Sequence, residues 1–150
     1  MNAFWLEEPG NPVIGATELS AQGIHNEAMP TSPEHYQQPL DVLREANGYI
    51  TQDQIALSPD TPNLQGICNK FKDEHYHDED EVRFVLSGSG IFDIRSNDDR
   101  WMRVEVSAGD LIVVPARRHH RFFLTDEKAI QCVRLFQDPT GWVAHYRNAA

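Results

Sequence analysis

Residues 75–88 read HYHDEDEVRFVLSG, and residues 109–122 read GDLIVVPARRHHRF. The second stretch combines a glycine turn, an apolar run typical of a buried strand, a proline turn and a histidine that enters a further strand. Similar apolar runs recur through the C-terminal half, and their close spacing leaves no room for crossover helices. This half therefore predicts antiparallel strands joined by hairpins into a sandwich or barrel. The predicted strands are 82–86, 91–95, 101–106, 111–114, 121–124 and 129–136, with a turn at SGSG (87–90).

The N-terminal part has a different character. Seven of the nine prolines precede residue 65, so only short elements are expected there. We predict a short helix near 16–22 that ends at Gly23, and a helix over about 32–46 that Pro39 interrupts before the stop signal Asn47-Gly48. The fold class is therefore β-dominated with minor α. We expect one domain over 1–150, with a proline-rich, partly helical part (1–64) and a barrel core (65–147).

Composition and charge exclude several classes of function. The 150 residues carry a net charge of −10, which repels nucleic-acid phosphates and anionic membrane surfaces. Cys68 and Cys132 lie far apart without CxxC spacing, so two free, buried thiols are favoured over a disulfide framework or a thiolate zinc site. The start MNAFWLEEPGNP has no basic region followed by an apolar run, and we therefore expect a cytoplasmic protein.

A cluster of metal-binding residue types lies in the first quoted stretch. If this segment is extended, His75, His77, Glu81 and Arg83 point to one side, while Tyr76, Asp78 and Asp80 point to the other. Imidazole nitrogens and a carboxylate suit divalent iron, nickel, manganese or zinc. The alternative is an acidic, solvated turn in which the histidines are incidental.

The two stretches together follow a recognisable pair of patterns. They read H-x-H-x3-E-x6-G and then G-x5-P-x4-H, and this pair resembles the two motifs of the cupin superfamily. The resemblance implies a double-stranded β-barrel with a short helical N-terminal part and the metal ligands His75, His77, Glu81 and His120. His119 and His120 cannot both face inward on an extended strand, and the motif spacing selects His120. The same alternation places Phe122 on the inner face.

Further segments are similar to the acireductone dioxygenase family. They are KFKDEH (70–75), HDEDEVRFVLSGSGIFDIR (77–95), GDLIVVPA (109–116), HRF (120–122), VRLF (133–136) and DPTGW (138–142). The resemblance covers about residues 49–146 and implies cleavage of 1,2-dihydroxy-5-(methylthio)pent-1-en-3-one by O₂ in methionine salvage. An iron form gives formate and 4-methylthio-2-oxobutanoate, and a nickel form gives formate, carbon monoxide and 3-methylthiopropionate. It also implies one Fe²⁺ or Ni²⁺ per chain. Separately, we expect a monomer or weak homo-oligomer, and the negative net charge argues against a nucleic-acid or membrane partner.

The same resemblance suggests roles around the metal. Arg83 and Arg134 would offset the negative charge of the substrate, although salt bridges to this acidic chain are the alternative. Aromatic residues would pack around the thioether tail, or else simply belong to the core. Asp80 would handle protons or orient the ligands, and the strand alternation favours orientation. The aromatic residues expected at the substrate are Phe71, Phe122 and Trp142.

Two other functions share this ligand set. One is a different metal-dependent cupin enzyme, either another dioxygenase or a sugar isomerase. The other is a metal-dependent cupin that senses a small molecule without turnover. Arg83, Arg134 and Trp142 together favour the acireductone dioxygenase hypothesis over both alternatives. Oxygen uptake would separate an acireductone dioxygenase from a sensor, and the choice of substrate would separate it from another enzyme.

Overall fold

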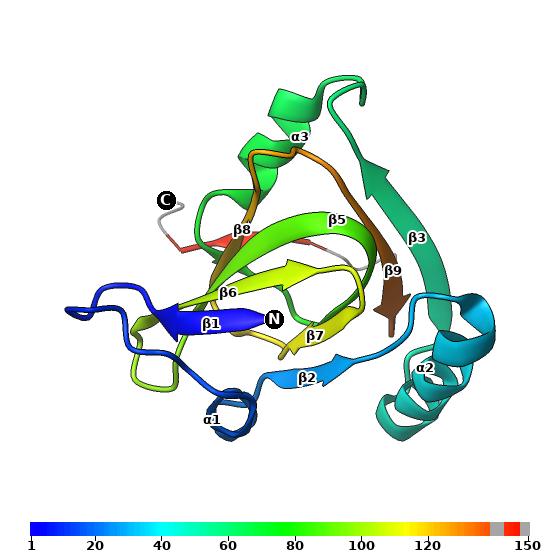
Figure 1. The fold of residues 1–150 in the computed structure, drawn as a ribbon, viewed down its shortest axis with the longest axis horizontal. Helices are drawn as coiled ribbons and strands as arrows, with labels where there is room; N and C mark the ends of the chain where they lie inside the picture. Colours follow the sequence, from blue (N-terminus) through cyan, green and yellow to red (C-terminus); the bar gives the residue numbers. More distant parts are fainter. Residues whose placement is uncertain (139–142, 148–150) are drawn as a thin grey trace.

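A computed structural model describes residues 1–138 and 143–147 (Figure 1). The expected mostly β fold with a partly helical N-terminal part is confirmed. In the described residues the helices are α1 (Ala16–Ala21), α2 (Pro33–Asn47) and α3 (Leu64–Phe71). The strands are β1 (Asn2–Trp5), β2 (His25–Ala28), β3 (Thr51–Leu57), β4 (His75–Tyr76), β5 (Glu81–Arg95), β6 (Trp101–Ser107), β7 (Asp110–Val114), β8 (His120–Leu124), β9 (Ile130–Phe136) and β10 (His145–Tyr146).

Strand β5 joins the two faces of the barrel. Its first half pairs with β7 and β9, and its second half pairs with β6 and β8, so one strand belongs to both sheets. One sheet has the order β1-β6-β5-β8-β4-β10, and in the other β2, β7, β5, β9 and β3 are paired in turn. All of these pairings are antiparallel, as the hairpin pattern predicts.

The turn predicted at SGSG (87–90) is wrong, because β5 runs through this segment without a break. A register shift between Val85 and Ser87 marks a bulge, and Gly88 adopts a positive φ of 77°. A Cβ at Gly88 would collide with the carbonyl oxygen of Ala129. A bulge and a glycine let a strand bend sharply while it keeps its hydrogen-bonded neighbours. The chain therefore changes direction here by a bend within one continuous strand and not by a turn between two strands.

The N-terminal part contributes three strands that were not predicted. Strands β1, β2 and β3 extend the sheets by pairing with β6, β7 and β9. The sequence of β3, TQDQIAL, hides its alternation because the inward position Asp53 is polar. This carboxylate faces Arg134 on β9, which explains why a charged residue stands at an inward position. Helix α3 was also not predicted.

Helix α2 covers the outer face of the sheet formed by β2, β7, β5, β9 and β3. The predicted interruption at Pro39 is wrong, since the helix continues across this residue to the predicted stop at Asn47-Gly48. Pro39 removes one backbone hydrogen bond, but Tyr36 and Leu40 on either side are buried against the sheet and hold the helix in place. Figure 1 shows α2 beside β3.

Two apolar cores result from this arrangement. The larger core lies inside the barrel and includes Val85, Phe92 and Ile112. The smaller one lies between α2 and the sheet and includes Phe84, which contacts the ring of Tyr36 at 5.2 Å between centroids. The alternation along β5 therefore directs one set of side chains into the barrel and the other towards α2.

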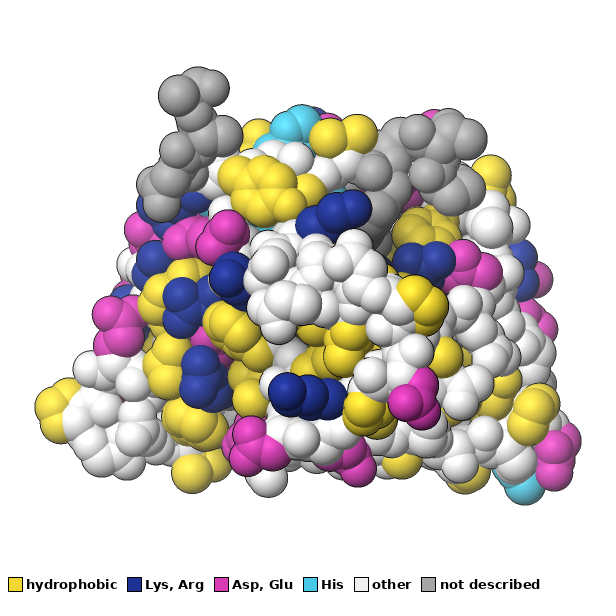
Figure 2. Space-filling model, turned by 90° about the horizontal axis from the view of Figure 1, so that it is seen from above, with side chains coloured by type: hydrophobic (Ala, Val, Ile, Leu, Met, Phe, Trp, Pro, Cys, Tyr) yellow, Lys and Arg dark blue, Asp and Glu magenta, His cyan; other side chains and the backbone are white. Residues whose placement is uncertain are grey.

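Charged side chains of both signs share the surface. Figure 2 shows basic, acidic and hydrophobic side chains interspersed on one face of the molecule. Below the surface, the fully buried carboxylate of Asp93 accepts hydrogen bonds from Arg103 and Arg121 at 2.8–2.9 Å. The negative net charge thus does not form a single acidic field on this face. Within the described residues, no helix has the length and apolar character needed to cross a membrane.

Candidate metal centre

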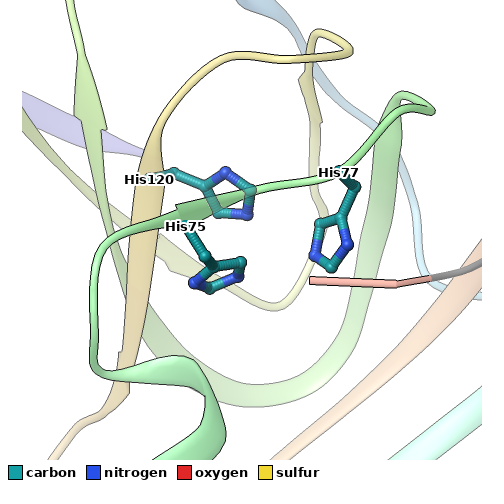
Figure 3. Close-up of side chains that lie close together, drawn as sticks. All are labelled: His75, His77 and His120. Atoms are coloured by element: carbon teal, nitrogen blue, oxygen red, sulfur yellow. The ribbon is translucent and has the colours of Figure 1, made fainter. Parts of the chain in front are cut away.

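Three histidines converge inside the barrel (Figure 3). His75 lies on β4, His77 follows this strand directly, and His120 begins β8 opposite His75. One ring nitrogen of each lies within 4.8 Å of those of the other two. All three side chains are buried, with residue exposures of 2%, 6% and 2%. The structure therefore brings together three of the four predicted metal ligands at metal-binding distances from one another.

Backbone carbonyls fix the orientation of each imidazole. The Nδ1 atoms of the three rings lie 2.7–2.9 Å from carbonyl oxygens, which can only accept a hydrogen bond, so each Nδ1 carries the proton. The remaining nitrogen, Nε2, then presents its lone pair to the centre. The accepting carbonyls belong to Asp73 for His75, Val143 for His77 and Arg118 for His120.

The donor set fits a divalent metal ion. The Nε2 atom of His120 is buried and has no hydrogen-bond partner among the described residues, as expected for a nitrogen whose lone pair is reserved for a metal. Burial lowers the pKa of His77 to about 4, so this ring is neutral near pH 7 and its lone pair is available. Burial also lowers the pKa of His75, whereas Glu81 raises the pKa of His120 by more than burial lowers it.

Glu81 supplies a carboxylate beside this cluster. Its oxygens lie 3.4 Å from Nε2 of His120 and 3.7 Å from Nε2 of His77. Burial raises the pKa of Glu81, but Arg83 and His120 lower it by more, so the pKa lies below its usual range. The carboxylate is therefore ionised and available as a fourth donor.

The segment is not the single extended strand that the alternation assumed, yet His75, His77 and Glu81 still lie close to one another. Strand β4 ends at Tyr76, and a bend over 78–79 precedes β5. Tyr76 points away from the centre and contacts the rings of His119 and His145. The side chain of His119 is 30% exposed and lies 3.3 Å from Glu74. His120 and the preceding His119 thus point to opposite sides of the chain, as the sequence predicts.

A cavity of about 190 Å³ opens from the metal centre into the barrel. One end is polar and the other is lined by aliphatic and aromatic side chains. The polar lining residues are His75, Glu81, Arg83, His120 and Arg134, and the others are Ile55, Leu57, Phe71, Phe92, Phe122, Ile130 and Cys132. Such a cavity suits a small ligand with a chelating head and an apolar tail.

Both predicted arginines line this cavity, and both also contact carboxylates. Arg83 donates to the carbonyl of Val82 at 2.9 Å and lies 3.4 Å from Glu81. Arg134 makes two parallel hydrogen bonds to Asp53, at 2.8 and 2.7 Å. The salt bridges considered as an alternative are therefore present, at positions that also face the cavity.

The predicted aromatic residues lie at the apolar end where they are described. The ring of Phe122 meets Phe71 edge-on at 6.3 Å between centroids and Phe92 at 4.9 Å. Trp142 lies outside the described residues. Phe71 reaches the cavity because it ends α3, an element that the sequence pattern did not reveal.

Asp80 lies behind the metal ligands and does not line the cavity. One of its oxygens accepts a hydrogen bond from the hydroxyl of Tyr49 at 2.6 Å, and the other accepts one from the amide of Ala116 at 2.8 Å. Burial raises the pKa of Tyr49, and the Asp80 carboxylate raises it further, so the hydroxyl stays protonated as a donor. The bond from Ala116 ties the segment before β5 to the turn before β8, and the bond from Tyr49 ties it to the segment before β3.

Sequence reasoning missed several residues that line the cavity or hold its arginines. On β9, Ile130, Cys132 and Arg134 stand two residues apart and face the same side. The predicted strand over 129–136 therefore already indicated that the first two face the cavity together with Arg134. Asp53 and Ile55 stand on β3, which was not predicted, and nothing in the sequence alone paired this strand with β9.

Comparisons with known proteins agree with this geometry. The sequence model of the ARD/ARD' family matches residues 10–144. Acireductone dioxygenases of Heterostelium pallidum and Dictyostelium discoideum are each 40% identical to the chain; the alignments cover 99% and 95% of this chain and 99% and 97% of those proteins. A solved structure of acireductone dioxygenase from Bacillus anthracis, with a cadmium ion in its active centre, superposes with a TM-score of 0.88. It is 30% identical, and the superposition covers 97% of this chain and 98% of that one.

Proposed function

This chain belongs to the ARD/ARD' family, and from that premise we propose how its cavity performs the reaction of an acireductone dioxygenase. Identity of 40% over nearly the whole chain and the histidine cluster together identify the chain as such an enzyme. The observation that carries the proposal is the cluster itself, which opens onto a cavity with an apolar far wall.

The metal would be one Fe²⁺ or Ni²⁺, held by the three histidines and Glu81. Imidazole nitrogens and a carboxylate suit such an ion, which would supply Lewis acidity and a template for a chelating oxygen donor. The three backbone carbonyls keep every Nε2 lone pair aimed at the centre. The ligands are thus oriented before any ion binds.

The arginines favour the ionised form of the substrate. An acireductone is an acidic enediol beside a ketone, and its deprotonated form carries negative charge on the chelating oxygens. Arg83 lines the cavity next to Glu81, and Arg134 lines it while paired with Asp53. Positive groups close to a hydroxyl stabilise its conjugate base, so both guanidiniums hold the enediolate in place and keep its protons off.

The apolar end receives the thioether tail. Phe71, Phe122 and Ile130 offer carbon surface to a methylthioethyl group and exclude water from it. Because the tail and the enediolate differ in polarity, the cavity admits the substrate in one direction only. The reacting carbons then lie at the metal end, where O₂ must arrive.

Oxygen consumption tests the proposed activity. Purified protein is stripped of metal, reconstituted with Fe²⁺ or Ni²⁺, and mixed with acireductone in an oxygen electrode cell. We expect uptake above the apo-protein background, formate from both forms, and carbon monoxide only from the nickel form. No uptake by either form would refute the proposed function.

A pair of acidic variants tests the role of Glu81. Glu81→Gln removes the carboxylate that faces the histidines, and we expect metal retention and oxygen uptake to fall together. Glu79→Gln is the matched control, because Glu79 accepts hydrogen bonds from the backbone amides of Gln137 and Asp138 outside the cavity. Full metal content in Glu81→Gln after gel filtration would show that this carboxylate is not a ligand.

A further inference from the structure

A glycine stands where the apolar end of the cavity is built. Gly90 is buried on β5, opposite Leu124 of β8. A Cβ at this position would lie 2.6 Å from Cε2 and 2.7 Å from Cζ of Phe122, and 3.1 Å from Cδ1 of Ile130. Both Phe122 and Ile130 line the cavity. The tips of two cavity-lining side chains therefore occupy the space that any side chain at position 90 would need.

Phe122 has little freedom to move elsewhere. Its ring packs against Phe92 at 4.9 Å between centroids and meets Phe71 edge-on at 6.3 Å. The cavity adjoins the same ring, and it is open space. A methyl group on Gly90 would therefore push the ring of Phe122 into the cavity, because the other neighbours are packed side chains.

This contact lies away from the metal. On β8 His120 belongs to the metal centre, and Phe122 is the next inward residue, about 6.6 Å farther along the strand. Gly90 is opposite Leu124, one inward position farther again. A displaced Phe122 ring would shorten the apolar end and leave the ligand histidines where they are.

We propose that Gly90 is a specificity-determining positioning residue, whose missing side chain keeps the ring of Phe122 out of the cavity and so sets the length of substrate tail that the cavity accepts. This inference rests on the proposed function and adds to it a limit on the substrate. It predicts that the enzyme distinguishes acireductones by tail length through a residue that does not line the cavity.

Two substrates and one substitution test this inference. The substrates share the enediol and ketone, but one carries the methylthioethyl tail and the other a methyl group. For Gly90→Ala we expect kcat/KM for the long-tailed substrate to fall by about tenfold or more, mainly through KM, since lost apolar contacts in a pocket have effects of this size. For the methyl-tailed substrate we expect a change below about twofold.

Gly15→Ala is the matched control, because a Cβ at Gly15 would meet nothing within 4 Å. Both of its kcat/KM values should equal those of the wild type. Metal content and melting temperature of each variant are measured alongside, so that loss of fold is separated from loss of fit.

A second pair of variants isolates the contact with the ring. Phe122→Leu removes the two ring atoms that the new methyl group would meet. Adding Gly90→Ala to Phe122→Leu should therefore change kcat/KM for the long tail by less than about twofold, and this comparison carries the test if Gly90→Ala alone does not fold. The inference is overturned if Gly90→Ala lowers kcat/KM equally for both substrates. It is also overturned if Gly90→Ala lowers kcat/KM for the long-tailed substrate by the same factor in the Phe122→Leu background. A wild-type enzyme that consumed neither substrate would refute the proposed function itself.

Discussion

Replacement of His120 by alanine should abolish tight metal binding while the barrel stays folded. His120 contributes a buried Nε2 without a hydrogen-bond partner among the described residues, and its Nδ1 is held by the carbonyl of Arg118. No other residue of β8 can replace it, because the next inward position is Phe122. The adjacent His119 provides a matched control on the opposite side of the chain.

The expected magnitude follows from ligand linkage. Loss of a partner that only orients a ligand lowers metal affinity about 10–100-fold, so loss of a ligand should cost at least 100-fold. A metal present at 100 times its Kd stabilises the folded wild type by about 2.7 kcal/mol, and at 100-fold weaker affinity by only about 0.4 kcal/mol. With about 2–4 °C per kcal/mol for a chain of this size, metal should raise Tm by about 5–11 °C in the wild type and about 1–2 °C in His120→Ala.

The assay is thermal unfolding with and without Ni²⁺, each variant being compared with its own apo form. This reference removes the direct effect of the substitution on stability. His119→Ala should keep the full metal-dependent shift and one bound metal per chain after gel filtration. An undiminished shift in His120→Ala, or a lost shift in His119→Ala, would refute the assignment of the inward face of β8.

Three further predictions concern charged groups. Arg134→Lys keeps the charge but cannot make two parallel bonds to Asp53, so KM for acireductone should rise about tenfold at unchanged metal content; an unchanged KM would contradict its anchoring role. Asp93→Asn should lower the free energy of unfolding by about 2 kcal/mol in urea titrations, because the buried carboxylate accepts charged hydrogen bonds; an unchanged midpoint would contradict this. Burial raises the pKa of Glu74, but Arg95 and Arg147 lower it by more, so the pKa lies below its ordinary value. The ionised carboxylate therefore contributes to the free energy of unfolding in full above the unfolded pKa of about 4.3, and this contribution is lost as the pH falls through the lower folded pKa. Urea titrations at a series of acidic pH values should show this loss in the wild type and not in Glu74→Gln.

Much of the site could be predicted from the sequence because several of its residues lie close together in the chain. His75, His77 and Glu81 fall within seven residues, and the motif spacing distinguished His120 from its neighbour. These positions depend on local alternation and on turns, both of which leave signals in the sequence. The strand predictions after residue 100 succeeded for the same reason, since each apolar run ends at clear turn residues.

The elements that were predicted wrongly or not at all depend on contacts with residues far away in the chain. Strand β3 is recognisable only beside β9, because its inward Asp53 makes sense only as the partner of Arg134. The continuity of β5 through 87–90 depends on neighbours on both sides, and a glycine pair alone reads as a turn. Likewise Pro39 is tolerated within α2 because the sheet buries the flanking residues. In each case tertiary packing overrode a local signal.

The orientation of the metal ligands depends on segments that are far apart in the chain. The carbonyl oxygens that fix the three imidazoles belong to Asp73, Arg118 and Val143, and the last of these precedes β10, which pairs with β4. His77 therefore gains its orientation only when the C-terminal segment has docked beside β4. Because no such arrangement exists in an unfolded chain, binding of the metal and closure of this segment stabilise each other. The arrangement of the ligand nitrogens is thus a property of the completed fold, although the residues that carry them can be read from two short stretches of sequence.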